Sequence, residues 1–384
     1  MNALNEIPDE GTMETVKDAE TAQLHDSADA KNDDTIVPVR DHHINMAERL
    51  PLTSWGSESA PSIPSVDEEG PVRDKDSAVD SIKSSTISLR SSIYEFVEEN
   101  GRTYHRYKEG KYALPNDEQE QERLDLQHAL FLVTTQGRLF LAPIGDDPHH
   151  VLDIATGTGL WAIEFAQMYP SAQVVGTDLS PIQPEYVPSN CSFEIDDAED
   201  EWTFSQKFDF IHGRALLSCF NDPLAMIKQA YDALAPGGYL ELQDGIFPME
   251  YIGEPPVNCA LYRWNKIILG GAEKAGRSWT NVKNYKRYLI EAGFEDVQEK
   301  RFFWPMSPWA KGKYFKTVAR FFQEDMLNGV EGISLRVLGA LGWPREDINI
   351  FLEQVKQDMR DTNIHAYLNI VFVIGRKPEA PKTA

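Results

Sequence analysis

A glycine-rich segment at residues 151–165, "VLDIATGTGLWAIEF", has residue types that suit the binding of a nucleotide-type ligand. An apolar run leads into a turn and then a helical pattern. Gly157, Gly159 and Ala162 have the G-x-G-x-x-G/A spacing of dinucleotide-binding turns. Glycine lets the backbone approach a ligand because no Cβ stands in the way. The spacing fits more than one ligand, so the neighbouring residues must distinguish between them.

Two acidic residues near this turn help to identify its ligand. Asp178 ends the next apolar run, "QVVGTD", where a carboxylate can accept both hydroxyls of a ribose, as expected for NAD and S-adenosylmethionine alike. Asp153 lies inside the first apolar run, where a pyrophosphate binder normally has only apolar residues. A carboxylate there suits an ammonium and a sulfonium better than two phosphates. The alternative is a hydrogen bond from a nearby loop amide.

The acidic loop after the third apolar run favours the same ligand. In "FEIDDAEDEW", Asp197 can accept a hydrogen bond from an adenine amino group while the backbone amide of Ala198 meets the ring. The carboxylates of this loop would repel a pyrophosphate, and most of them are expected to be solvated. We therefore predict S-adenosylmethionine as the cofactor, and not a nicotinamide dinucleotide. No metal site is expected, because the histidines and cysteines form no ligand cluster.

Candidates for the chemistry lie where the fourth and fifth apolar runs end. They are His212 and Arg214 in "FIHGRALL", and Gln243 and Asp244 in "LELQDG". Methyl transfer from a sulfonium requires alignment and exclusion of water, and a base only when the nucleophile carries a proton. His212 titrates in a useful range, with a structural histidine as the alternative. Arg214 can hold a carboxylate of the donor or the acceptor, or pair with Asp244.

The elements that must position these residues follow from the pattern of the chain. Short apolar runs alternate with helical patterns, which predicts a doubly wound α/β domain with a parallel sheet. In such a sheet the ligand lies at the carboxyl ends of the strands, by the switch point. Strands are expected at 151–155, 173–178, 191–196, 208–213 and 239–244, near 297–303 and at 366–377, and helices at 160–169, 223–235 and 281–294.

Two helical insertions, at about 254–276 and 306–362, interrupt this scheme and are too apolar and too periodic to be linkers. We expect them to form a helical cap. Their bulky residues suit an apolar wall around a flat acceptor, and the alternative is that they form the core of the cap itself. The residues concerned are Tyr262, Trp264, Trp304, Trp309 and Phe315.

The part of the chain before the sheet has two sections. Residues 1–88 are acidic, poor in aromatics and without a sustained apolar period, which predicts a disordered tail. In "SIYEFVEENGR", Ser92 and Glu95 have the spacing of a capping box and Gly101 suits the end of a helix. A second helix is expected to begin at Asn116 or Asp117 and to end at Gly137, with one face formed by Leu124, His128 and Phe131.

The overall composition excludes several classes of partner. The 384 residues carry a formal net charge of −24, which argues against binding of nucleic acid. No apolar run is long enough to span a membrane, so no membrane partner is expected. The beginning of the chain lacks the features of a secretory signal, and Cys191, Cys219 and Cys259 form no disulfide framework. These features favour a reducing compartment, the cytoplasm.

Several motifs of the chain resemble those of a known protein family. "LDIATGTG", "GTDLS", "IDDAEDEW" and "LAPGGYLEL" resemble the motifs of class I S-adenosylmethionine-dependent methyltransferases. The longer runs "YKEGKYALPNDEQEQERLDLQHALFLV" and "KQAYDALAPGGYLELQD" resemble the fungal LaeA-like methyltransferases of secondary metabolism. The resemblance covers about residues 93–378. It implies a Rossmann-like seven-stranded methyltransferase domain at 149–379, with an N-terminal helical segment at 89–148 that closes over the donor site.

The same resemblance implies a set of donor-binding residues. Ala155 stands where many class I members have glycine, and alanine is the smallest substitute. Tyr107, Tyr112 and Asn116 are implied to close over the donor, where an aromatic face stabilises a sulfonium; for both tyrosines a core position is the alternative. The full set is Asp153, Ala155, Gly157, Gly159, Asp178, Leu179, Asp197, Ala198, Tyr107, Tyr112 and Asn116.

Three functions are compatible with these features. The first is a methyltransferase that acts on a small-molecule secondary metabolite. The second is a LaeA-type regulator that binds the donor but works through protein partners in the nucleus. The third, a nicotinamide-dependent oxidoreductase, is disfavoured by Asp153 and the acidic loop around Asp197. The first two share every motif, and no basic cluster of nuclear-signal type favours the second.

Overall fold

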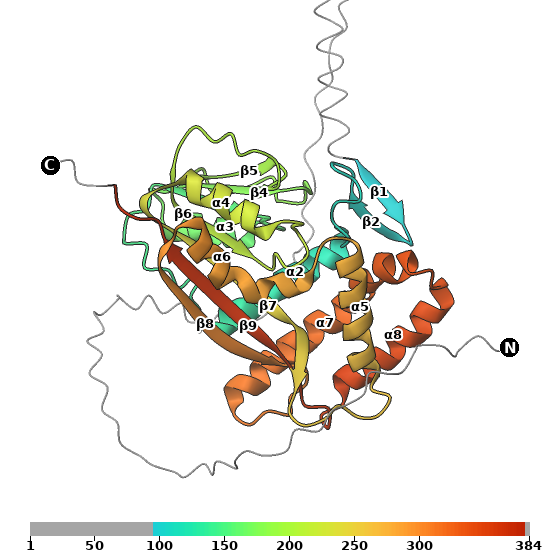
Figure 1. Cartoon of the computed structure of the whole chain (residues 1–384). Helices are drawn as coiled ribbons and strands as arrows, with labels where there is room; N and C mark the ends of the chain where they lie inside the picture. The colour runs from blue at the N-terminus through green and yellow to red at the C-terminus, as the bar shows by residue number, and fades with distance from the viewer. Residues whose placement is uncertain (1–94, 381–384) are drawn as a thin grey trace, which may run out of the picture. The chain divides into compact units, whose positions relative to one another are not determined.

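The computed structural model describes residues 95–380, and its centre is a seven-stranded sheet with strand order β5-β4-β3-β6-β7-β9-β8 (Figure 1). The first five strands of this order are parallel, and β9 runs antiparallel to both of its neighbours. The strands are β3 (His150–Ile154), β4 (Gln173–Asp178), β5 (Cys191–Ile195), β6 (Phe208–Arg214), β7 (Leu234–Tyr251), β8 (Glu295–Pro305) and β9 (Ala366–Arg376).

This order confirms the predicted fold class and creates a place for a ligand. β3 lies between β4 and β6, so the chain moves outward in opposite directions from β3. Side chains and loops at the carboxyl ends of these three strands therefore surround a crevice at the switch point. The glycine turn follows β3, Asp178 ends β4, and Arg214 ends β6.

Helices cover both faces of the sheet because its strands are apolar on both sides. Consecutive residues of a strand point to opposite faces. In β3, Val151 is buried in a cluster that includes α3 (Leu160–Met168). The next residue, Leu152, belongs to a different cluster formed with α4 (Pro223–Ala233) and α6 (Tyr285–Ala292). The sheet is thus doubly covered, as the alternation of strands and helices predicts.

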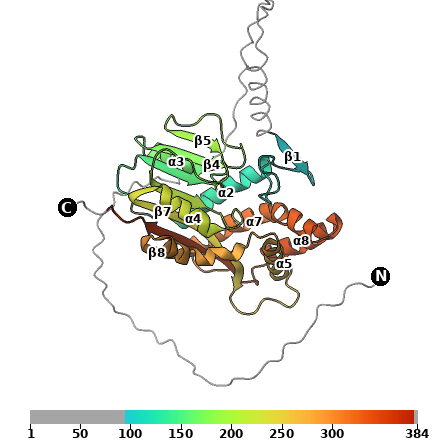
Figure 2. The ribbon, with the colours of Figure 1, turned by 45° about the horizontal axis from the view of Figure 1, so that its top comes forward.

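The two predicted insertions form a helical cap with its own core. The first contains α5 (Ala260–Lys274), and the second contains α7 (Lys313–Ala340) and α8 (Arg345–Arg360). A short 3₁₀ helix, η2 (Trp279–Asn284), leads from α5 to α6. Figures 1 and 2 both show α2 (Glu118–Thr134) between the sheet and α7, so that α2 borders both the sheet and the cap.

The segment before α2 differs from the prediction. Where a helix was expected, β1 (Phe96–Glu99) and β2 (Arg102–His105) form an antiparallel hairpin. Asn100 and Gly101 join the strands with φ angles of 57° and 74°. Two consecutive residues with positive φ form the tight turn that fits the twist of a hairpin, and Asn-Gly is its preferred sequence. The helical prediction is therefore wrong for this part of segment 89–148.

The second predicted helix is present. α2 begins after Asp117, whose side chain accepts a hydrogen bond from the backbone N–H of Glu120 at 3.1 Å. The predicted tail at residues 1–88 lies outside the described residues. Within residues 95–380, no helix is long and apolar enough to cross a membrane, and no group of three or more potential metal ligands is found.

Candidate functional site

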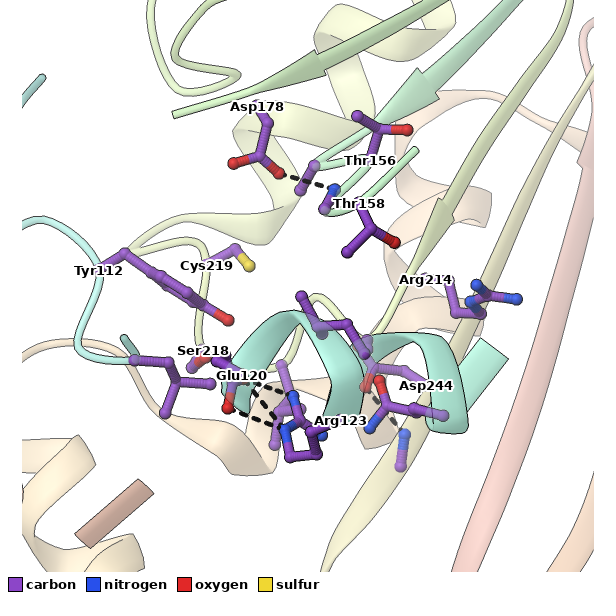
Figure 3. Close-up of a pocket in the computed structure, with 18 of the residues that line it drawn as sticks. Tyr112, Glu120, Arg123, Thr156, Thr158, Asp178, Arg214, Ser218, Cys219 and Asp244 are labelled. Atoms are coloured by element: carbon purple, nitrogen blue, oxygen red, sulfur yellow. Dashed lines mark hydrogen bonds and ion pairs between the residues drawn. The ribbon is translucent and has the colours of Figure 1, made fainter. Parts of the chain in front are cut away.

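A cavity extends from the carboxyl ends of the strands to the cap, and Figure 3 shows part of its lining. We describe it in two halves. The strand-end half is lined by Tyr112, Asn116, Asp153, Ala155, Thr156, Gly157, Thr158, Asp178, Leu179, Ser180, Asp197 and Ala198. The cap half is lined by Glu120, Arg123, Gln127, Phe131, Phe247, Trp279, Trp304, Phe322, Asp325, Met326, Ile333, Leu368 and Ile370. Arg214, Ser218, Cys219 and Asp244 line the cavity as well.

The glycine turn brings the backbone to the surface of the cavity. Gly157 has a φ of 59°, and an added Cβ there would meet only a methyl of Leu124, at 3.5 Å. Ala155 lines the cavity with a φ of 51°, a left-handed conformation that glycine adopts more easily. Gly159 differs from the expectation: it does not line the cavity, and an added Cβ would overlap the ring of Phe193. Gly159 therefore permits close packing of α3 on β5.

Asp178 lies at the edge of this turn. Its Oδ2 accepts a hydrogen bond from the Gly157 N–H at 2.9 Å, the dashed line at Asp178 in Figure 3. Its Oδ1 accepts one from the Ser180 N–H at 2.8 Å. Burial raises the pKa of the Asp178 carboxyl to about 6. A carboxylate has about four acceptor positions, so two backbone bonds leave capacity for the hydroxyls of a ligand.

Asp153 and His212 form a buried pair across the neighbouring strands β3 and β6. The Nδ1 atom of His212 lies 2.7 Å from Oδ1 of Asp153, and the Thr156 hydroxyl donates to Oδ2 at 2.5 Å. The imidazole is stacked on Trp161 with ring centroids 3.8 Å apart. Burial lowers the pKa of His212, so the ring is neutral at pH 7 and Nδ1–H donates to Asp153. His212 thereby holds the Asp153 carboxylate in place.

Asp197 is paired with a residue that the sequence did not reveal. Lys111 forms an ion pair with the buried Asp197 and lies 3.1 Å from Glu199. Lys108 reaches Asp200 of the same loop at 2.6 Å. Burial acts to raise the pKa of Asp197, but the hydrogen bond from Lys111 and the charges of both lysines lower it on balance. The segment between β2 and α2 is thus held to the loop after β5 at the predicted adenine position.

The three residues expected to cover the donor take different positions. Tyr112 and Asn116 line the cavity, and Asn116 lies 3.4 Å from the Ser180 hydroxyl through its Nδ2. The Asn116 side chain also accepts from Thr103 of β2 at 2.9 Å. Tyr107 does not line the cavity and is half-buried beside the acidic loop. Tyr112 and Asn116 are thus placed at the cavity and the ring of Tyr107 is not, and their closure over the donor stays a prediction.

Arg214 and Asp244 line the cavity but do not pair with each other. The guanidinium of Arg214 lies over the ring of Phe131 at 4.8 Å, and its Nη2 lies 2.9 Å from Nδ1 of His128. Burial lowers the pKa of Arg214 to about 10. The alternative that Arg214 simply pairs with Asp244 is therefore wrong.

Asp244 has its own set of partners. Its Oδ2 accepts hydrogen bonds from the Leu216 N–H at 2.9 Å and the Tyr285 hydroxyl at 3.0 Å, and Oδ1 accepts from the Gly245 N–H at 2.8 Å. Burial raises the pKa of the carboxyl to about 7. The catalytic roles of His212, Arg214 and Asp244 stay predictions.

Only one of the five aromatic residues expected to form the acceptor wall lies in the cavity. Trp304 lines the cap half and donates to the Thr134 hydroxyl at 2.7 Å. Trp264 is fully buried in the core of the cap, and Tyr262 is 37% exposed on its surface. Trp309 and Phe315 line a separate groove with Ile252 and Tyr367. The size of these side chains could be read from the sequence, but the direction in which each one points could not.

The cap half also contains charged residues that were not predicted. Arg123 donates to Glu120 of the same helix and to Asp325 of α7, at 2.7 Å in each case. The sequence contains a signal for the charged residues on α2. Residues 120, 123 and 127 continue the helical stripe formed by Leu124, His128 and Phe131. Charged residues on the buried stripe of a helix require partners, and this feature marks them as candidates.

Comparison with known proteins places these features in context. Residues 126–299 match a family described as "Methyltransferase domain". The chain is 35% identical to the methyltransferase pytC of Aspergillus terreus, over 82% of this chain and 95% of that protein. It is 33% identical to the secondary metabolism regulator laeA of Aspergillus fumigatus, over 85% of this chain and 91% of that protein.

A solved structure is similar at a lower level. It is that of Haemonchus contortus phosphoethanolamine N-methyltransferase 2 in complex with S-adenosyl-L-methionine. It is 15% identical to this chain, with a TM-score of 0.43, and the match covers 79% of this chain and 75% of the other.

Proposed function

Because this chain belongs to the family of S-adenosylmethionine-dependent methyltransferases that includes pytC and laeA, we propose that it methylates a small molecule held in the cap half of the cavity. The observation that carries this proposal is the continuity of the cavity. One space joins the strand ends, with their ligand-type carboxylates, to a mainly apolar region enclosed by α2, α7 and β8. Such a region suits a small apolar molecule better than a protein segment.

The residues of the strand-end half fit S-adenosylmethionine. Asp178 retains acceptor positions for ribose hydroxyls, and Leu179 and Ala198 offer apolar contact to the adenine. Asp197 is a buried carboxylate that can accept a hydrogen bond from the adenine amino group. Asp153 provides negative charge next to the turn, and Tyr112 offers an aromatic face from the opposite side. We infer that these residues hold the donor.

When bound, S-adenosylmethionine supplies an electrophilic methyl group that a nucleophile takes in an in-line displacement. We infer that Asp244 takes the proton when the nucleophile carries one. Its pKa of about 7 suits this role near neutral pH, and Oδ1 has a single protein donor, the Gly245 N–H. The Tyr285 hydroxyl and the Leu216 N–H fix the carboxylate through Oδ2.

The two other predicted catalytic residues support this arrangement. His212 orients Asp153, because its Nδ1–H donates to that carboxylate. Arg214 is held over Phe131 and against His128, so its charge is fixed beside the cavity and can take a carboxylate of the donor or the acceptor. Neither role requires the residue to exchange a proton.

A second candidate function is supported by the similarity to laeA over 91% of that protein. In this alternative the chain binds the donor, acts through protein partners and works in the nucleus. The same cavity would then serve regulation, and the methyl acceptor would be a protein.

Replacement of the chromosomal gene by the Asp178→Ala variant distinguishes the two functions. The small-molecule function predicts that one methylated compound disappears and that the same compound lacking a methyl group accumulates. The pattern of transcripts is expected to stay unchanged. Broad changes in transcripts and in many unrelated compounds, with no such pair, would support the regulator and contradict the proposal.

A further inference from the structure

A buried ionic cluster in the cap half has no role in the chemistry described so far. It consists of Glu120 and Arg123 on α2 and Asp325 on α7, which are 4%, 6% and 2% exposed. All three residues line the cavity. Figure 3 shows Glu120 and Arg123 on the side of the cavity opposite Asp178.

The hydrogen bonds of the cluster leave one oxygen weakly occupied. The Nε atom of Arg123 donates to both oxygens of Glu120 at 3.0 Å, and Nη2 donates to Glu120 at 2.7 Å. Nη1 donates to Oδ1 of Asp325 at 2.7 Å. The Oδ2 atom of Asp325 receives only a long hydrogen bond, 3.4 Å from Nε2 of Gln127. A buried carboxylate oxygen normally requires a stronger donor than this.

The net charge of the cluster also indicates that the Asp325 carboxylate is only partly compensated. Two carboxylates surround one guanidinium, so the formal charge of the cluster is −1, and none of the three side chains is more than 7% exposed. Burial raises the pKa of Asp325, in keeping with incomplete compensation of its charge. Asp325 links α7 to Arg123 of α2 through Oδ1 alone, and this link does not use Oδ2. The spare acceptor capacity of Asp325 is therefore available to a ligand.

The side chains around Asp325 indicate that the rest of the ligand is apolar. Phe322 and Met326 flank Asp325 on α7, and Phe131 and Trp304 lie close to this part of the wall. These side chains are apolar and fixed by ring contacts, with Phe131 and Trp304 at a centroid distance of 4.9 Å. A molecule that fills this space must be mainly apolar and must satisfy the carboxylate at one point of its edge.

Building on the methyltransferase function proposed above, we propose that the cap half binds an acceptor that is mainly apolar and donates an N–H or O–H hydrogen bond to Oδ2 of Asp325. The class includes aromatic N–H heterocycles, phenols and aryl amines. Asp325 is on this account a specificity residue that selects and orients the acceptor. It takes no part in the transfer itself.

Matched probe pairs test this proposal with the full chain saturated with S-adenosylhomocysteine. The pairs are indole with 1-methylindole, and 2-naphthol with 2-methoxynaphthalene; each pair differs mainly in the hydrogen-bond donor. Dissociation constants are measured by ligand-observed NMR. In each pair, the compound with the N–H or O–H group is expected to bind roughly tenfold tighter or more than its methylated partner. This is the scale of a hydrogen bond to a charged group.

Two variants show whether Asp325 is the cause. Asp325→Asn should abolish the preference within each pair, whereas Glu324→Gln, a change on the exposed face of the same helix, should preserve it. A purely structural role for Asp325 predicts a lower melting temperature and equal weakening of both members. Equal binding of the members by the unaltered protein, binding by none of the four probes, or a preference that survives Asp325→Asn would overturn the proposal.

The affinity for S-adenosylhomocysteine, measured in the same samples, separates this proposal from the function on which it rests. If S-adenosylhomocysteine binds but the two members of each probe pair bind equally well, the acceptor proposal fails and the methyltransferase function stands. If the product does not bind, the strand-end half has been assigned wrongly and the proposed function itself fails.

Discussion

At the scale of single residues, the half-buried Asp178 has the contacts that a ribose-binding carboxylate needs. Its two backbone partners orient it, and its pKa of about 6 keeps it ionised at neutral pH. Asp178→Ala should weaken binding of S-adenosylhomocysteine by roughly 1.5–3 kcal/mol, the value of hydrogen bonds to a charged group. Isothermal calorimetry measures the change. Normal affinity in a folded variant would contradict the assignment of Asp178 to the ribose.

The same residue predicts a pH dependence with a definite sign. Ribose hydroxyls donate to the ionised carboxylate, so binding of the product lowers the pKa of Asp178 below its value of about 6 in the free protein. The affinity should be constant above about pH 6 and fall as the pH drops below it, by up to roughly tenfold per pH unit. In Asp178→Ala this dependence should disappear. An affinity that rises on acidification would show that another group controls binding.

Asp244 gives a different prediction, because it is assigned to the acceptor and not to the donor. Asp244→Asn removes the proton acceptor but keeps the size of the side chain. Turnover should fall roughly 100-fold or more, the usual contribution of a general base, while the affinity for S-adenosylhomocysteine should stay unchanged. Rate and affinity are measured on the same preparation. Full turnover in this variant would mean that the nucleophile loses its proton to another group or carries none.

Sequence reasoning located most acidic residues of the site but not their partners. Asp153, Asp178 and Asp197 each follow or interrupt an apolar run, so their places at strand ends could be predicted. Lys111 and Asp325 are paired with residues far along the chain, and no local pattern identifies such partners. Long-range pairing depends on how the elements pack, which periodicity does not specify.

At the scale of elements, Lys111 connects the segment between β2 and α2 to Asp197, the residue that we propose binds the adenine. A donor that binds there must share Asp197 with this lysine. Lys111→Met should therefore raise the affinity for S-adenosylhomocysteine roughly fivefold or more, because the carboxylate no longer has to exchange its partner. Lys108→Met is the comparison variant. Lys108 lies 2.6 Å from Asp200 and 3.6 Å from the Asp197 carboxylate, so its effect should have the same sign and be smaller. A weaker affinity in Lys111→Met would mean that the lysine orients Asp197 for the ligand.

β8 and the loop that follows it provide a matched pair of tryptophans. Trp304 lines the cavity, whereas Trp309 lines the separate groove and donates to the Ala366 carbonyl at 3.1 Å. Trp304→Phe should lower turnover roughly tenfold or more through misalignment of the acceptor, and leave donor affinity intact. Trp309→Phe should leave both unchanged. Equal turnover in the two folded variants would exclude the cap half as the acceptor site.

The hairpin shows why one element was predicted wrongly. Ser92 and Glu95 have capping-box spacing, and Asn100-Gly101 is compatible with both a helix end and a hairpin turn. The positive φ of both residues selects the hairpin. Arg102 of β2 also forms two hydrogen bonds with Asp117, at 2.5 and 2.7 Å, which tie the strand to the start of α2. This tertiary contact cannot be read from the local pattern, although the Asn-Gly dipeptide favoured the hairpin.

At the scale of the whole molecule, the sheet could be predicted because most of its strands contain a short apolar run bounded by helix or turn signals. "QVVGTD" coincides with β4, and the two insertions coincide with the cap helices. The arrangement of the cap could not be predicted, because Trp264 and Trp304 look alike in the sequence. One forms the core of the cap, and the other faces the cavity.

The composition of residues 1–88 leads to a prediction for the full chain. This segment has no core-forming pattern, so a chain shortened to residues 89–384 should melt cooperatively at an unchanged temperature and bind S-adenosylhomocysteine with unchanged affinity. Calorimetric melting and titration of both proteins test this directly. Aggregation of the shortened protein, or a lower melting temperature, would show that the segment packs on the domain.

We propose that the protein transfers a methyl group from S-adenosylmethionine to a small molecule, with both bound in one cavity. The most direct test supplies the purified chain with donor that carries a labelled methyl group. The chain also receives an extract of the organism after deletion of the gene, so that the unmethylated acceptor has accumulated. The extract is divided into small molecules and proteins, and Asp178→Ala is the matched control. We expect label in one small molecule, and none with the Asp178→Ala control. Label found only in protein, or in neither fraction although the donor binds, would contradict this proposal.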